Sequence, residues 1–337
     1  MNKIAKYLFL KVLFLIASIF VSATIIFILP RLVPSNPLII KVMTIQRRLE
    51  SNPEAVEAAL KSLYEYFEFN KPLHEQYISF LAKVFRGDLG TSISMFPLKT
   101  TEIIGRALPW TLALLFPATL LAWFIGNTLG AVAGYRRGSI FEKISMVISL
   151  ILSQAPYYWI AMLLIYLFVI KYSIFPLAGA YSETLIPSLT PKFILDVLWH
   201  YTLPFLSLLI TGIGWWAISM RALIIYELES DYIRFSRSLG VKTRKLFMYA
   251  FRNSMLPQVT NLAINLGYNF AGALLTEVVF SYPGVGWYLY SAISSLDYPV
   301  IQGLFLIVII ALFLAVFIVD FIYALLDPRI RLGYSEV

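Results

Sequence analysis

The 337-residue sequence contains no cysteine and only two histidines, His74 and His200. Without cysteine, the chain has no disulfide, no thiolate-bound zinc and no cysteine nucleophile. Two histidines leave little scope for a histidine-built metal site. The Gly-x4-Gly-Lys-Ser/Thr pattern of nucleotide-binding loops is also missing, so energy from ATP would have to be supplied by another protein. We therefore expect a protein that is not an enzyme and has no catalytic residue, metal or cofactor.

Charged residues are scarce as well, at 14% of the sequence, whereas hydrophobic residues reach 59% and the mean hydropathy is +0.77. A soluble protein of this length needs more charge to cover its surface, so the composition predicts a polytopic membrane protein. An apolar stretch of about 20 residues spans a bilayer as a helix. Six stretches qualify, and the predicted fold is all-α with six transmembrane helices. These stretches cover residues 8–30, 110–134, 144–170, 203–225, 258–280 and 301–326.

The 27 basic residues indicate the orientation. With the N-terminus inside, 15 of them fall in inside segments, and the short outside loops hold only Lys171 and Lys192. The other 10 lie in segment 31–109, which is long enough to be exempt from the positive-inside rule. The pattern predicts a multi-pass plasma-membrane protein with both termini cytoplasmic. The net charge of +8 then reflects topology and contact with lipid, and nucleic acid is not an expected partner.

Segment 31–109 is expected to form an external helical subdomain. Ser51 to Glu54 has the residues of a helix start, with a capping serine, a proline in the first turn and a glutamate three positions later. Helices are predicted over 54–69 and 74–85, and segment 171–202 should be external and irregular, with a short helix near 193–199. The predicted domains are 1–30 (N-terminus and first span), 31–109, a core of 110–326 and a cytoplasmic tail of 327–337.

Residues 227–257, here called the insert, lie between the fourth and fifth spans and are basic and amphipathic. Asp231 suits the positive end of a short helix dipole, and Gly240 suits its C-terminal cap. A second helix from about residue 242 should lead into the fifth span at Pro257. Such a segment is typical of a lipid-headgroup anchor, or of a helix that docks in the groove of a partner protein. The residues alone leave both open.

The insert resembles the EAA loop of ABC importer permeases of the oligopeptide/dipeptide group. The matching residues are Asp231-Tyr-Ile-Arg234, Arg237, Gly240 and Arg252-Asn-Ser-Met-Leu-Pro257. The likeness extends along almost the whole chain in the same order and spacing. Further matching motifs are Leu32–Pro37, Lys71–Tyr77, Arg86–Ser92, Thr276–Gly286 and Asp297–Gly303.

This resemblance implies a type I ABC importer architecture and several partners. They are a second, homologous permease subunit that forms a heterodimer with this chain, two ATP-binding cassette ATPases, and an external solute-binding protein that meets segments 31–109 and 171–202. The implied function is ATP-driven import of oligopeptides or dipeptides by alternating access, with oligosaccharides or another small solute as the alternative cargo. The implied ATPase-coupling residues are Arg234, Phe235, Arg237, Leu239, Gly240, Val241, Arg244 and Phe247.

The fifth span carries polar residues on one helix face, at Gln258, Asn261, Asn265, Asn269 and Thr276. Amides that face lipid would be costly, so the face should meet other helices or water. Asn261, Asn265 and Asn269 are therefore candidates to line a translocation pathway. Helix–helix hydrogen bonding is the other interpretation.

Two other features bear on mechanism. Ala122, Gly126, Gly130 and Gly134 form a row of small residues that predicts close helix packing. Glu277 and Asp320 lie near the ends of their spans, where structural pairing is the expected role. An ion-gradient-driven secondary transporter is the alternative class, but it usually shows internal repeats and midplane carboxylates, and neither is seen here.

Overall fold

The computed structural model describes residues 3–32, 53–272 and 274–326. These residues are mostly helical, and the only β-type pairing among them is an isolated antiparallel bridge between Thr91 and Lys99. The chain divides into two compact units. Unit 1 comprises residues 1–109 with 287–337, and unit 2 comprises residues 110–286.

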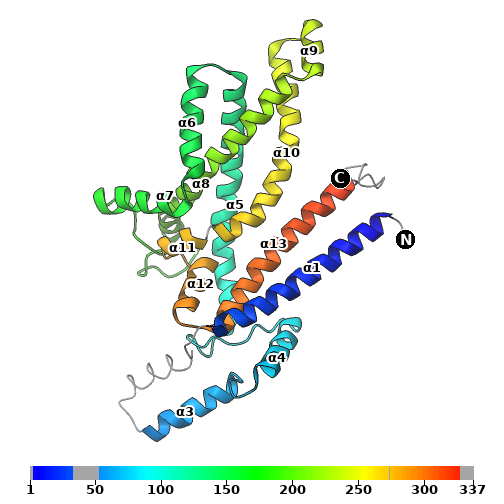
Figure 1. Ribbon diagram of the computed structural model, residues 1–337. Helices are drawn as coiled ribbons and strands as arrows, with labels where there is room; N and C mark the ends of the chain where they lie inside the picture. The colour runs from blue at the N-terminus through cyan, green and yellow to red at the C-terminus, as the bar shows by residue number, and fades with distance from the viewer. Residues whose placement is uncertain (1–2, 33–52, 273, 327–337) are drawn as a thin grey trace. The chain divides into compact units, whose positions relative to one another are not determined.

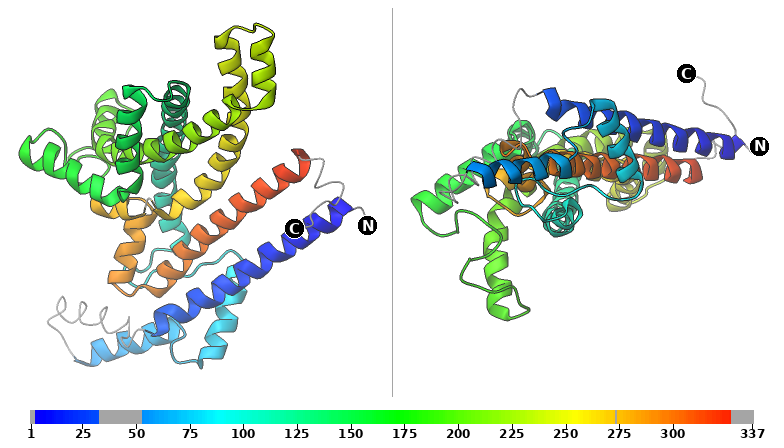
Figure 2. Two further views of the ribbon diagram at one scale, coloured as in Figure 1. Left: turned by 45° about the horizontal axis from the view of Figure 1, so that its top comes forward. Right: turned by 90° about the horizontal axis from the view of Figure 1, so that it is seen from below.

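Unit 1 is built on a long helix pair from the two ends of the chain. Helices α1 (Lys3–Ile28) and α13 (Tyr298–Leu326) lie side by side (Figures 1 and 2). A 3-10 turn, η1 (Leu29–Leu32), follows α1. Two shorter helices come next, α3 (Pro53–Tyr66) and α4 (Leu73–Phe85), and α4 packs on α1 where Phe27 meets Tyr77 and Phe80.

A buried carboxylate ties the loop after α4 to the start of α13. Asp297 has no exposed surface, and its oxygens accept hydrogen bonds from the backbone N–H groups of Ile93 (3.0 Å) and Ser94 (2.9 Å). The hydroxyls of Ser92 (2.5 Å) and Ser94 (2.6 Å) also donate to it. Four donors compensate the desolvation of the charge, so this contact fixes the loop within unit 1.

Unit 2 is a helical bundle with α8 (Pro191–Leu228) at its centre. Around α8 pack α6 (Ile140–Gln154), α7 (Tyr157–Leu164) and α10 (Thr243–Gly272). A π-helical segment, η2 (Ile165–Lys171), continues α7, and α11 (Leu274–Val279) follows α10. Helices α5 (Thr100–Tyr135) and α12 (Val285–Ser294) each cross the boundary between the units.

The predicted row of small residues is where α5 meets α8. A Cβ built at Gly126 would lie 2.5 Å from the Trp216 Cβ, and one at Gly130 would collide with the backbone of Ala217. Ala122, in the same row, is 1% exposed. Small side chains thus let the two backbones approach closely, as in other membrane helix pairs.

Three helical segments of the described residues are long and apolar enough to cross a bilayer, at Phe9–Leu32, Thr100–Tyr135 and Pro191–Leu228. A fourth is obtained if α6 and the segment Tyr157–Lys171, which meet at a bend of 100°, count as one span. The chain is thus an all-α polytopic membrane protein. The other two predicted spans, 258–280 and 301–326, fall on α10 with α11 and on α13, and the total of six remains a prediction.

The structure corrects the expected outlines of three segments. The predicted span 144–170 is broken at Ala155, because the residue before a proline disfavours helical geometry and Pro156 follows it. The expected short helix near 193–199 is the first part of α8, which is capped by Thr190. The two parts of the sequence on either side of Pro257 form one continuous helix, α10.

The α5–α8 contact gives a testable prediction. Gly130→Ala should lower the thermal unfolding midpoint of the purified protein, because the new methyl group would collide with the Ala217 backbone. Gly105→Ala is the matched control, since it lies in the same helix with open space around its Cβ. Its midpoint should stay the same or rise, because alanine favours a helix by roughly 1 kcal/mol over glycine. Equal midpoints for the two variants would contradict the close-packing account.

Candidate functional site

The first helix of the insert is held to the rest of unit 2 by one fully buried side chain. Helix α9 (Asp231–Ser238) follows α8 after a short turn, and its Ile233 has no exposed surface. Burying an isoleucine contributes about 1.5–3 kcal/mol, so α9 is held in a defined position at the end of the bundle (Figure 1). The buried residues that form this cluster with Ile233 are Ala131, Met220, Ile224, Leu246 and Ala250.

Gly240 makes the turn between α9 and α10. Its φ is +76°, a region that side-chain-bearing residues rarely adopt. The N–H of Gly240 donates to the Arg237 carbonyl, and the N–H of Val241 donates to the Ser236 carbonyl. This pattern closes the C-terminus of α9 as glycine caps do, so the predicted helix end is confirmed.

The eight predicted coupling residues divide between exposed and partly buried positions. Phe235 and Leu239 are 65% and 67% exposed, although both are large and apolar. Gly240 and the three arginines of the set (Arg234, Arg237, Arg244) are also exposed. In contrast, Val241 and Phe247 are partly buried against the Ile233 cluster, and the Phe247 ring lies 4.9 Å from that of Tyr135.

Ion pairs connect neighbouring helices at the end of the bundle that carries α9. Glu142 is buried and accepts from the Arg221 guanidinium at 2.5 and 2.8 Å and from the N–H of Gly138. Arg137 pairs with Glu229 just before α9. These contacts connect the α5–α6 turn to α8 and were not identified from the sequence.

The polar face of α10 divides between packing and a hollow. Gln258 is fully buried; its side-chain amide nitrogen donates to the Ser219 hydroxyl (2.9 Å), and its backbone carbonyl accepts from the Trp123 indole (3.1 Å). This residue therefore serves helix packing. Asn261 is half-buried, and its backbone carbonyl accepts from the Asn265 amide. The side chain of Asn269 lies outside the described residues.

Asn265 lines a hollow of about 340 Å³ within unit 2. The other walls come from the break between α6 and α7 and from the middle of α8. Gln154, Tyr157 and Trp215 join Asn265 there and were missed in the sequence, although Pro156 signalled the break. The remaining lining residues are Ser153, Ala155, Pro156, Thr211, Gly212 and Trp216.

Glu277 and His200 have local structural roles. Glu277 is fully buried, and its carboxylate accepts from the N–H of Gly286 at 2.6 Å, which closes the turn after α11. The His200 ring nitrogen lies 2.9 Å from the Asp196 carbonyl oxygen. Within the described ranges no group of three or more His, Cys, Asp or Glu side chains is arranged to hold a metal ion. The Asp320 side chain is not among those that the structure describes.

Comparison with known proteins decides the family. Residues 126–332 match the family described as "Binding-protein-dependent transport system inner membrane component". The chain belongs to this family of ABC importer permeases. The permease is 33% identical to the di/tripeptide transport system permease protein DppB of Pseudomonas aeruginosa, over 94% of this chain and 96% of that protein.

Two further relatives support the assignment. The permease is 30% identical to the probable D,D-dipeptide transport system permease protein DdpB of Escherichia coli, over 93% of each chain. It is 28% identical to the Escherichia coli glutathione transport system permease protein GsiC, over 97% of this chain and 99% of that protein. Membership of this family implies an ATPase and a substrate-binding protein as partners.

The turn at Gly240 gives the second prediction. Gly240→Val should reduce the retention of ATPase subunits on the purified permease several-fold, because a β-branched residue strains the positive φ and displaces α9. No heavy atom lies within 4 Å of the added Cβ position, so crowding is not the cause. Gly87→Val is the matched control, with φ +74° and equally open space in unit 1. It should retain the ATPases, and equal loss in both variants would contradict the predicted docking of the insert on the ATPase.

Proposed function

We propose that this permease forms one half of the membrane channel of an ATP-driven importer of dipeptides or oligopeptides. The other half is a second, homologous permease, and two ATPases and an external solute-binding protein complete the transporter. The names of the relatives, which refer to di/tripeptide, D,D-dipeptide and glutathione transport, support peptides as the cargo class. Both termini are cytoplasmic in this proposal, and segments 31–109 and 171–202 meet the binding protein.

The observation that carries the proposal is the exposed face of α9. Phe235 and Leu239 stand out from a helix whose Ile233 is fully buried, so their exposure is a fixed feature of the fold. Exposed apolar side chains bordered by polar ones mark interaction sites. Arginines interspersed among them suit an acidic rim, and a short amphipathic helix suits a groove on a partner. We assign this face to the ATPase.

Helix α10 provides the mechanical link. Its first turns belong to the insert, where Leu246 is buried beneath α9, and its later turns carry Asn261 and Asn265. A helix of 30 residues is about 45 Å long at 1.5 Å per residue. When ATP draws the two ATPases together, a push on α9 is transmitted along α10 to the hollow. Transport then follows from a shift between inward-open and outward-open packings.

The hollow suits a conduit for peptides. Asn265 and Gln154 offer uncharged hydrogen-bonding groups, and Tyr157 and Trp215 offer aromatic surface. Uncharged amides bind the polar backbone of a peptide without creating a deep charged well that would trap it. Asn261, Asn265 and Asn269 are the pathway residues of this proposal, and Asn265 has the direct support of the hollow.

Asn265→Leu should lower the rate of peptide transport about tenfold in the reconstituted importer, because it removes the amide from the wall of the hollow. Among the described residues its amide donates only to the Asn261 carbonyl of the same helix, so the thermal midpoint should change little. Thr128→Val is the control, since Thr128 bonds the Phe124 carbonyl and faces outward. A fall in stability with normal transport per folded molecule would instead indicate a packing role for Asn265.

Reconstitution of the complete transporter tests the function itself. Uptake of a labelled dipeptide into proteoliposomes should require the binding protein and ATP at the ATPase side, and it should survive ionophores that collapse ion gradients. Uptake by the permease alone, or uptake abolished by ionophores in the presence of ATP, would favour the secondary-transporter class and overturn the proposal.

A further inference from the structure

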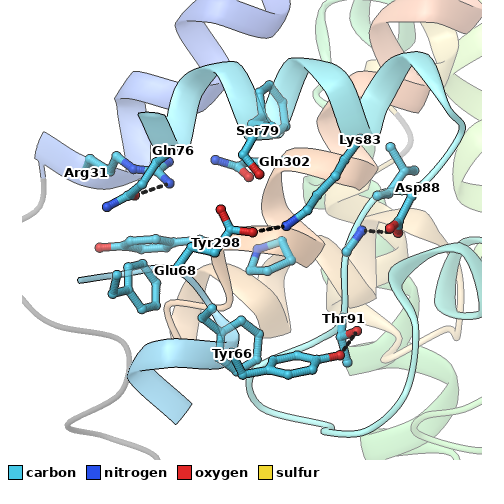
Figure 3. Close-up of a pocket in the computed structure, with 16 residues that line it drawn as sticks. Arg31, Tyr66, Glu68, Gln76, Ser79, Lys83, Asp88, Thr91, Tyr298 and Gln302 are labelled. Carbon is cyan, nitrogen blue, oxygen red and sulfur yellow. Dashed lines mark hydrogen bonds and ion pairs between the residues drawn. The ribbon is translucent and has the colours of Figure 1, made fainter. Parts of the chain in front are cut away.

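Unit 1 contains a pocket of about 320 Å³ that the coupling and pathway assignments do not use. Figure 3 shows it between α4, the start of α13 and the segment that follows α3. Its volume falls within the range of small-molecule sites, and its walls combine five aromatic rings with eight polar or charged side chains. The aromatic residues among the lining are Tyr66, Phe67, Phe69, Phe80 and Tyr298.

The charged groups of the pocket are separated along its length. Arg31 lies at one end and Asp88 at the other (Figure 3). The Arg31 guanidinium donates to the Phe27 carbonyl and to Gln76 Oε1, and it is in cation–π contact with the Phe27 ring at 3.6 Å. The ion pairs among the described residues give Arg31 no carboxylate partner. Its positive charge is therefore available to an anion.

The negative charge of Glu68, near the middle, is already compensated by two lysines. Its carboxylate pairs with Lys83 at 2.9 Å and with Lys71 at 3.2 Å. The hydrogen bond from Lys83, with a smaller contribution from Lys71, lowers the pKa of Glu68 to about 2, so it stays ionised at physiological pH. At the far end, one oxygen of Asp88 accepts from the N–H of Gly90, which leaves the other for a cation.

Gln302 supplies the observation that points to a ligand. It is 7% exposed, and its amide nitrogen has no hydrogen-bond partner among the residues described. The side chain faces the same recess as Glu68 and Lys83 (Figure 3). A buried N–H group without an acceptor costs about 1–3 kcal/mol, and such groups in native proteins call for an explanation. A carbonyl oxygen in the pocket would provide the acceptor.

We propose that this pocket binds a short zwitterionic peptide. The peptide carboxylate lies at Arg31, a backbone carbonyl accepts from the Gln302 amide, and the terminal ammonium lies at Asp88. The aromatic walls cover the side chains of the ligand. The proposal rests on the peptide-importer function above and adds a second cargo site on the permease itself, separate from the hollow of unit 2.

The test is isothermal titration of alanyl-phenylalanine into the purified full-length permease without its binding protein. Saturable binding is expected. Amidation of the peptide's C-terminus should weaken it at least tenfold, because the charge for Arg31 is lost, and N-acetylation should weaken it at the Asp88 end. Equal affinity for the free, amidated and acetylated peptides, or no binding at all, would overturn the proposal.

Variants of the permease test whether the peptide binds in this pocket. Gln302→Leu should weaken binding of alanyl-phenylalanine about tenfold, while the protein remains folded, because an apolar side chain removes an unsatisfied group. Ser295→Ala is the control, since Ser295 lies in unit 1 outside the pocket, and its hydroxyl donates to the backbone carbonyls of Ser291 and Ala292 at the end of α12. Unchanged affinity in Gln302→Leu would overturn the assignment.

The assembled importer separates this proposal from the proposed function. If the wild-type importer takes up peptide with ATP but the isolated permease binds none, the pocket proposal fails and the function stands. If Gln302→Leu alters only the affinity of the permease for its binding protein, the pocket holds an acidic side chain of that protein and the free-peptide proposal is wrong. Absence of ATP-driven peptide uptake by wild type would instead refute the function.

Discussion

The burial of Ile233 is the contact on which the functional account depends. It fixes an eight-residue helix that is otherwise largely exposed, and a helix of that length is not stable in isolation. With Ile233 seated beside Leu246 and Met220, Phe235 and Leu239 are directed outward in a defined arrangement. In the proposed mechanism, this fixed position of α9 allows a force on its exposed face to move the bundle as well as the helix.

Close packing provides the second constraint. Helices α5 and α8 meet at Gly126 and Gly130, where even a methyl group does not fit, and the Glu142–Arg221 pair connects α6 to α8 near the insert. These contacts pack α5 and α6 closely against α8. The continuous α10 joins the insert to the hollow at Asn265, so that the proposed coupling segment and the proposed pathway share one structural element.

The sequence predicted features that depend on local chemistry or on helical periodicity. The glycine cap at Gly240, the helix over 74–85 (observed as Leu73–Phe85) and the packing role of the small-residue row are of this kind. Sequence-based prediction failed where tertiary contacts determine the structure. Pro156 is a local signal for the bend, but the strong hydrophobicity of residues 144–170 led to the prediction of one unbroken span. The Asp297 contact joins residues about 200 positions apart, and no periodic pattern reveals such a pair. Likewise, only the surroundings show that Phe247 packs inward while Phe235 does not.

The absence of cysteine from the sequence makes site-specific labelling the most direct test of the central claim, that the exposed face of α9 contacts the ATPase at the cytoplasmic side. In the assembled transporter, Leu239→Cys should cross-link to an ATPase subunit through a short thiol-reactive reagent. In intact cells it should resist a membrane-impermeant thiol reagent that labels Leu189→Cys, because Leu189 is exposed in segment 171–202, which is external in the proposal. Labelling of Leu239→Cys from the external medium, without a cross-link to the ATPase, would contradict the account.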